Sequence, residues 1–157
     1  MRTTEISQLM TELNRFITQD GVDDREKEWA LRQLDDPQLQ AKVKLLSTTD
    51  IKIIAQLAQS EACHAKSLPR LTGLSQATIS RCLTKLAKLA LATKFRDLKN
   101  NKEILVRLTD SGQQVAELHR QLDAEIAKRA QVIAADYTAA ELARFVSLMH
   151  RISEIKL

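Results

Sequence analysis

The sequence predicts a mainly α-helical protein with one short β-hairpin, and three observations lead to this fold class. Hydrophobic residues make up 44% of the 157 residues but aromatic residues only 3%, which favours helices packed through aliphatic side chains. The chain has three glycines and two prolines, so few turns are available. Apolar residues recur at steps of three and four along most of the chain, which is the spacing of amphipathic helices.

Four helices are expected in the N-terminal third, over residues 4–18, 25–34, 37–45 and 48–58. Gly21 interrupts the pattern, and Asp24 is expected to cap the second helix. Asp36 caps the third, with Pro37 at the first helical position, where a missing N–H costs nothing. Ser47 and Asp50 have the spacing of a capping box for the fourth.

The middle of the chain predicts a helix-turn-helix. A short helix starts at Ala65 or Ser67 and ends near Thr72, and Gly73 supplies the turn. Ser75 is expected to cap the second helix of the motif. The apolar residues of that second helix share one face, which we expect to be buried: Ile79, Cys82, Leu83 and Leu86.

The opposite face of this second helix carries short polar groups and cations. Side chains of this kind suit the major groove of DNA, where Gln pairs with adenine, Arg with guanine, and methyl groups contact thymine. We expect base contacts from Gln76, Ala77, Thr78, Ser80 and Arg81. An ordinary solvated helix face more often alternates Glu and Lys, whereas residues 76–95 contain no acid. This difference favours a DNA-reading helix.

After this helix the periodicity changes to that of two strands, over residues 92–96 and 104–108. Such a hairpin beside a helix-turn-helix is a wing. Its tip carries Lys99, Asn101 and Lys102, which are expected to contact phosphates or a narrow minor groove. The sequence therefore predicts a winged helix-turn-helix with a small two-stranded antiparallel wing.

Charge is concentrated in the same region. Residues 63–109 contain ten basic residues and two acids, a net charge of +8 in a chain whose total is +4. A basic centre between acidic flanks is typical of a nucleic-acid contact surface, although a solvated basic face without a partner would have the same composition. Arg70 and Lys85 are expected to add phosphate contacts.

The C-terminal part predicts two helices. Thr109 caps a long helix that ends near Ala135, and Thr138 and Glu141 form a capping box for the last one. The chain is therefore expected to have three regions. Residues 1–46, which include helical segments at about 21–44, are expected to form dimerisation helices. Residues 47–109 form a DNA-binding lobe, and residues 110–157 form C-terminal dimerisation helices. The flanking apolar faces are too extensive for one small lobe to cover, which favours a two-fold dimer.

The order of these elements resembles the MarR family of bacterial transcription regulators. The motifs are Leu46-Ser47, Thr72-Gly73-Leu74-Ser75, and a strand ending in Leu108-Thr109 with Gly112 three residues later. The resemblance implies a homodimer with intertwined terminal helices that places two winged lobes in successive major grooves of a palindromic operator. It also implies a repressor released by a small aromatic or phenolic effector, for which Phe16 and Trp29 are candidate cleft residues. Packing in the core would explain these two aromatic residues equally well.

The chain departs from the family pattern at four places. Residues 21–44 look like an extra helical insert between the first two family helices, and Pro69 stands where the family favours alanine. The other two departures are beside the wing and within it. Ala90 stands where the family usually has glycine before the first wing strand, so that turn must be made without one. The wing lacks the usual arginine and has Lys102, a point charge rather than a planar fork. Weaker contact with the minor groove is the expected consequence.

Other functions have less support in the sequence. A non-specific architectural DNA binder and a protein–protein adaptor with a winged fold remain alternatives. No catalytic set, metal-ligand spacing or cofactor motif is recognised, so we expect neither an enzyme nor a cofactor. Cys63 and Cys82 leave oxidant sensing open, although burial explains Cys82 better. Two cysteines without ligand spacing and no signal peptide or membrane span predict a cytoplasmic protein. The resemblance to the MarR family implies association with the bacterial nucleoid.

Overall fold

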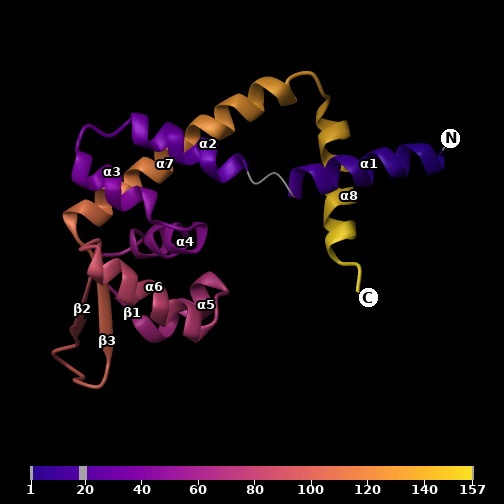
Figure 1. Cartoon of the computed structure of the whole chain (residues 1–157). Helices are drawn as coiled ribbons and strands as arrows, with labels where there is room; N and C mark the ends of the chain where they lie inside the picture. The colour runs from indigo at the N-terminus through magenta and orange to yellow at the C-terminus, as the bar shows by residue number, and fades with distance from the viewer. Residues whose placement is uncertain (1, 18–20, 157) are drawn as a thin grey trace. The chain divides into compact units, whose positions relative to one another are not determined.

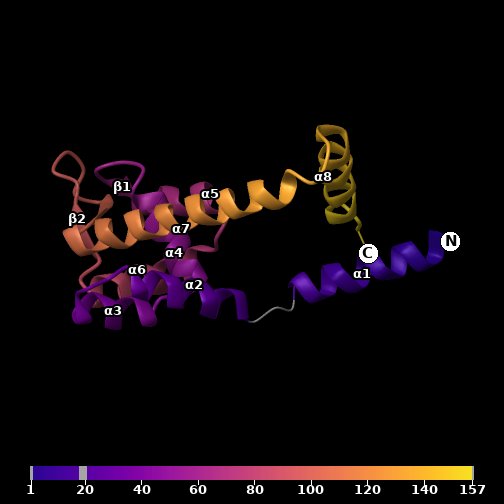
Figure 2. The same ribbon diagram turned by 90° about the horizontal axis from the view of Figure 1, so that it is seen from above.

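The computed structural model describes residues 2–17 and 21–156 and divides into two compact units, Met1–His119 and Arg120–Leu157. Figures 1 and 2 show the elements from two directions. The helices are α1 (Arg2–Ile17), α2 (Gly21–Arg32), α3 (Pro37–Lys44), α4 (Thr48–Leu57), a 3₁₀ turn (Ala65–Ser67), α5 (Leu68–Thr72), α6 (Gln76–Lys88), α7 (Asp110–Ala134) and α8 (Ala139–Ser153). The strands are β1 (Cys63–His64), β2 (Ala92–Arg96) and β3 (Ile104–Leu108). The predicted mainly helical winged fold is confirmed.

The expected helix starts are confirmed where a capping side chain defines them. Asp36 accepts a hydrogen bond from the Gln38 N–H, and Ser47 and Asp50 form the reciprocal capping box of α4. The cap predicted at Asp24 is wrong, because α2 begins at Gly21 and Asp24 lies in its first turn. An acidic residue is favourable throughout the first turn of a helix, so it marks the region of a helix start and not its boundary.

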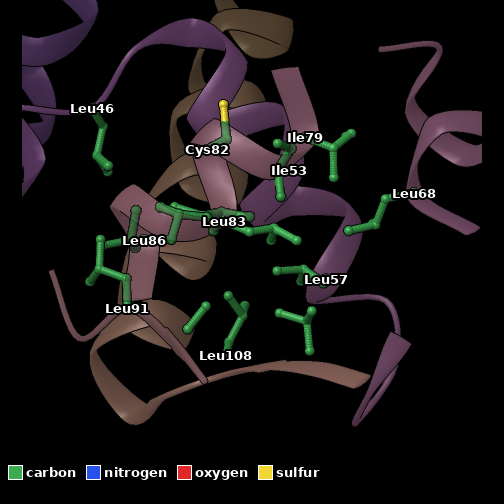
Figure 3. Close-up of a cluster of buried hydrophobic side chains, with 14 of the residues drawn as sticks. Leu46, Ile53, Leu57, Leu68, Ile79, Cys82, Leu83, Leu86, Leu91 and Leu108 are labelled. Atoms are coloured by element: carbon green, nitrogen blue, oxygen red, sulfur yellow. The ribbon is translucent and has the colours of Figure 1, made fainter. Parts of the chain in front are cut away.

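The core of the first unit is made by residues from α3, α4, α5, α6, the start of α7 and the sheet (Figure 3). From α6 it contains Ile79, Cys82, Leu83 and Leu86, as the sequence predicts. In α4 the buried apolar residues are Ile53, Ile54 and Leu57, and Ile51 is only partly buried. Leu39 and Val43 show that part of the expected insert, α3, is built into this core.

The hairpin of β2 and β3 has the predicted bounds, and it extends beyond the helices (Figures 1 and 2). Its register pairs Ala92 with Leu108 and Arg96 with Ile104. The structure adds a third strand, β1, which pairs antiparallel with β3 on its other side, so the strand order is β1-β3-β2. β1 thereby fixes the base of the wing to the segment that precedes α5.

A close approach between α7 and the turn after α6 sets where the wing begins. The Leu91 carbonyl accepts the Thr109 N–H at 3.0 Å, and the Thr109 hydroxyl donates to the Ala90 carbonyl at 2.6 Å. Gly112 lies against the same carbonyl, since a Cβ on it would lie 2.0 Å from the Leu91 oxygen. This contact explains physically why glycine follows Leu108-Thr109 at that spacing. Ala90 makes the turn with a φ of 55°, a conformation that glycine adopts more easily.

The two C-terminal helices also start as expected. The Thr109 hydroxyl accepts the Gly112 N–H at 3.1 Å at the beginning of α7, and Thr138 with Glu141 forms the capping box of α8. Apolar residues recur at steps of three and four along α7, and the first of them, Val115, Leu118 and Leu122, are buried. The later members Ile126 and Ile133 are exposed, as is much of the apolar face of α8. Among the described residues, no helix is both long enough and apolar enough to cross a membrane.

We predict that Gly112→Ala lowers the free energy of unfolding by about 3 kcal/mol, because the new methyl group displaces the Leu91 carbonyl in a packed site. Gly73→Ala is the matched control: Gly73 has a φ of 71°, but no atom lies within 4 Å of an added Cβ. Backbone strain alone predicts a loss of about 1 kcal/mol there. Urea unfolding of both variants measures the difference, and equal losses would contradict the close-contact explanation.

Candidate nucleic-acid interface

Helix α6 is held with one face inward by its cap and by its apolar stripe. The Ser75 hydroxyl accepts the Thr78 N–H at 3.2 Å, and Ser75 itself is extended, with φ −68° and ψ 153°. Gly73 ends α5 in the left-handed conformation and turns the chain toward α6. The stripe from Ile79 to Leu86 is buried, so the rotation of α6 about its axis decides which residues face outward.

The residues predicted to read bases lie on the outer face of α6. Gln76, Ala77, Ser80 and Arg81 are exposed, and Thr78 is half-buried. Thr78 receives a hydrogen bond from the Ser75 hydroxyl at 2.9 Å, and an Arg81 nitrogen lies 3.5 Å from its hydroxyl oxygen. The guanidinium of Arg81 is therefore near, and only weakly bound to, its own helix. The arrangement offers an amide, hydroxyl groups and a guanidinium to a ligand outside the lobe.

Lys85 is in a different situation from the other predicted phosphate ligands. Its ammonium donates to the Asp50 Oδ2 at 2.6 Å, and Asp50 is only 1% exposed. Burial by itself raises the pKa of Asp50, but hydrogen bonds from Lys85, Ser47 and Cys82 outweigh it and hold the pKa below its ordinary value. Asp50 is thus a buried carboxylate that joins α4 to α6.

Arg70, the other phosphate ligand predicted outside the wing, lies on α5 and is exposed.

The wing tip is an ordered loop between β2 and β3. The Asp97 carboxylate accepts the Lys99 N–H at 2.9 Å, and the Asn100 side chain accepts the Lys102 N–H at 3.2 Å. Arg96 donates to the Asn101 carbonyl at 2.7 Å. Lys99, Asn101 and Lys102 are exposed, so the backbone of the loop is fixed while its cations face solvent. Leu98, at the same tip, is 99% exposed.

The base of the wing carries a small charged cluster. Glu103 pairs with Lys66 at 2.5 Å, and its other carboxylate oxygen lies 3.3 Å from the His64 Nδ1, though without hydrogen-bond geometry. Lys66 is largely exposed, so solvent weakens its pair with Glu103. The cluster adds a polar connection between the hairpin and the segment before α5.

The sequence did not identify Asp50 or Arg96 as parts of this region. Asp50 was assigned only to the cap of α4, and nothing in its spacing from Lys85, 35 residues later, indicates a pair. Arg96 was counted only as a positive charge, whereas it binds the Asn101 carbonyl within the wing. Both roles depend on contacts that exist only after folding.

The remaining candidate residues are two aromatic residues and two cysteines. Trp29 is half-buried in α2, and Phe16 on α1 is 76% exposed. Burial raises the pKa of the Cys82 thiol to about 11 and also raises the pKa of Cys63, the opposite of the shift expected for a reactive cysteine. No group of three or more His, Cys, Asp or Glu residues suited to a metal ion occurs among the described residues.

Comparison with known proteins finds no matching family model and no matching curated protein, but it finds many solved structures. Streptococcus pyogenes adhesin competence repressor (AdcR) matches with a TM-score of 0.63 and 16% identity, over 98% of this chain and 96% of that one. A variant of Lactococcus lactis ZitR gives 0.64 and 17%, over 98% and 97%. The PcaV transcriptional regulator of Streptomyces coelicolor gives 0.57 and 26%, over 87% and 96%.

The chain has the fold of the MarR-family regulators. The expected resemblance is confirmed at the level of the fold, and the matched structures cover nearly the whole chain. Within the MarR fold of this chain, the residues predicted to contact DNA lie on the outer side of α6, on the hairpin tip and, for Arg70, on α5.

We predict that Asp50→Asn flattens the loss of stability in acid. The pKa of Asp50 is lower in the folded chain than in the unfolded chain, so its contribution is complete above about pH 4 and is lost as the pH falls through the folded value. The variant is less stable at neutral pH because Lys85 loses a charged partner. Urea unfolding between pH 7 and pH 2.5 tests this, and parallel curves for parent and variant would refute the lowered pKa.

Proposed function

We propose that the chain is a dimeric, sequence-specific DNA-binding transcription regulator. The observation that carries the proposal is the division of α6 into a buried apolar face and an exposed face of short polar groups with Arg81 and no acid. Such a helix fits the major groove, and the cationic tip of the adjacent hairpin fits phosphates or the minor groove. Gln76, Thr78, Ser80 and Arg81 read bases, and Ala77 offers a methyl contact.

The similar proteins support repression under the control of a ligand. One of them is described as a repressor, and PcaV, a transcriptional regulator, is also described in complex with its natural ligand. We therefore propose that binding of a small aromatic or phenolic molecule weakens the hold of this chain on DNA. Phe16 and Trp29 are the aromatic residues that we assign to its cleft.

A homodimer is supported by apolar surface that the single chain leaves uncovered. On α8, Phe145 is 53% and Val146 is 66% exposed, and Ile133 near the end of α7 is 66% exposed. Contiguous apolar surface on a helix usually marks an interface with another chain. We assign residues 1–46 and 110–157 to dimerisation and 47–109 to DNA binding. In this proposal the protein has no catalytic role and acts on the DNA of a bacterial cytoplasm.

Selection of bound duplexes from a random pool tests the function directly. A regulator of this kind enriches one palindromic motif, with half-sites about 34–36 Å apart along the duplex. Binding without an enriched motif would instead indicate an architectural DNA binder. Failure to retain any duplex would indicate an adaptor that has the winged fold without the DNA function.

We predict that Arg81→Ala weakens binding to the selected duplex by about 1–3 kcal/mol and relaxes sequence choice at one base pair. Arg81 is exposed, and its hydrogen bond to Thr78 of its own helix is long, so the variant should unfold at the same urea concentration as the parent. Titrations at one fixed salt concentration measure the effect. Equal affinity of variant and parent would remove Arg81 from the base-reading set.

We predict that Lys102→Ala weakens binding to all duplexes alike and lowers the slope of log affinity against log salt by about 1, because one phosphate contact is lost. Lys128→Ala, which removes an exposed lysine of α7 that is not among the proposed DNA contacts, is the control and leaves the slope unchanged. Titrations of both variants over a range of salt concentrations check this. An unchanged slope for Lys102→Ala would show that the wing does not touch the backbone of DNA.

A further inference from the structure

The Asp50–Lys85 pair connects α4 and α6, which otherwise pack through apolar side chains and a hydrogen bond between Cys82 and Asp50. The Asp50 Oδ2 accepts hydrogen bonds from the Ser47 N–H at 2.8 Å, the Ser47 hydroxyl at 2.9 Å and the Lys85 ammonium at 2.6 Å. The first two bonds lie within the cap of α4, and the third reaches α6. Asp50 is 1% exposed, whereas the Lys85 side chain is 39% exposed.

Apolar packing alone fixes the position of α6 better than its rotation. Burial of Ile79, Leu83 and Leu86 is favourable in any orientation that keeps the stripe inside, because the hydrophobic effect has no direction. A rotation of about 20° about a helix of 10–12 Å diameter moves its outer surface by about 2 Å. That displacement exceeds what a hydrogen bond to a base edge tolerates. A directional contact is therefore needed to hold the outer face in register.

The pair has the position and strength for this task. Lys85 follows Arg81 by one helical turn, at the border between the buried stripe and the exposed face of α6. A charge-assisted hydrogen bond of 2.6 Å has a strong preference for one geometry. Release of Lys85 to a DNA phosphate would leave Asp50 as a buried charge with its ammonium partner gone, which is costly.

We propose that Asp50, through Lys85, is the positioning residue that sets the rotation of α6 and thereby the choice of base sequence. Lys85 then contributes to recognition through its bond to Asp50, which holds α6 in place, and is not a phosphate ligand. This inference rests on the proposed DNA-binding function. It also replaces the phosphate contact that the sequence suggested for Lys85.

The chain offers a matched control within the same cluster. Lys85→Met removes the ammonium and keeps most of the alkyl chain, so it breaks the bond between α4 and α6. Ser47→Ala removes the hydroxyl bond to the same carboxylate oxygen but breaks nothing between the two helices. Lys85→Met with Asp50→Asn removes both charges, so this double variant folds even if the single variant does not.

The experiment measures the affinities of each variant for the selected duplex and for a duplex with one changed base pair, at several salt concentrations. Lys85→Met and the double variant lose about tenfold or more in affinity for the selected duplex. The ratio of the two affinities falls toward one, and the salt slope stays that of the parent. Ser47→Ala lowers the urea midpoint but keeps the affinity ratio. A uniform loss with a slope lower by about 1 would make Lys85 a phosphate ligand and overturn the proposal.

Amide hydrogen exchange without DNA gives a second readout. Loss of the pair speeds exchange in residues 76–88 relative to the parent, whereas Ser47→Ala speeds it in 48–57. Unchanged exchange in α6 and an unchanged affinity ratio in the double variant would each overturn the positioning role. If the parent binds no duplex specifically, the proposed function fails, and the exchange measurement alone decides whether the pair holds α6.

Discussion

The opposition between the two faces of α6 is the constraint on which the rest of this structure depends. Ile79 and Leu86 are fully buried, and each such side chain contributes about 1.5–3 kcal/mol relative to exposure. The helix therefore cannot turn its polar face inward without a large loss. The Ser75 cap fixes where the helix begins. The Asp50–Lys85 pair adds a directional contact to apolar packing, which by itself has no preferred direction.

The position of the wing follows from the end of the same helix. Leu91 is buried directly after α6, and its carbonyl receives the Thr109 N–H beside Gly112. Strand β2 begins at the next residue, so one tight contact sets the start of β2, the end of β3 and the start of α7 together. β1 and the Glu103 cluster then fix the other side of the hairpin. The tip is thereby presented by a supported hairpin and not by a loose loop.

Much of this fold could be predicted from the sequence because its signals are local. Capping residues such as Ser47, Ser75 and Thr138 act within one helical turn, so the spacing of a few letters identifies them. The inner face of α4 was harder to assign, since Ile51, Ile53 and Ile54 are all apolar and packing alone selects among them. Gly21 was taken as a break, yet a glycine is tolerated at the first position of a helix.

The features that could not be predicted from the sequence depend on contacts between segments that are distant along the chain. β1 has only two residues and forms because it pairs with the edge of β3. Two residues are too few to show the alternating pattern that predicts a strand. Asp50 and Lys85 each had a sufficient local explanation, a cap and a surface charge, and only the packing of α4 on α6 shows that they form a pair. The outer face of α6 was predicted correctly as an exposed surface, because burial of its apolar stripe fixes the opposite side.

Backbone chemical-shift mapping of the isotope-labelled protein with the selected duplex tests the central claim most directly. The account predicts that the largest changes fall on residues 76–85 of α6 and on 97–102 at the wing tip, while amides of α4 change little. Large changes confined to other helices, with α6 and the wing unaffected, would contradict it.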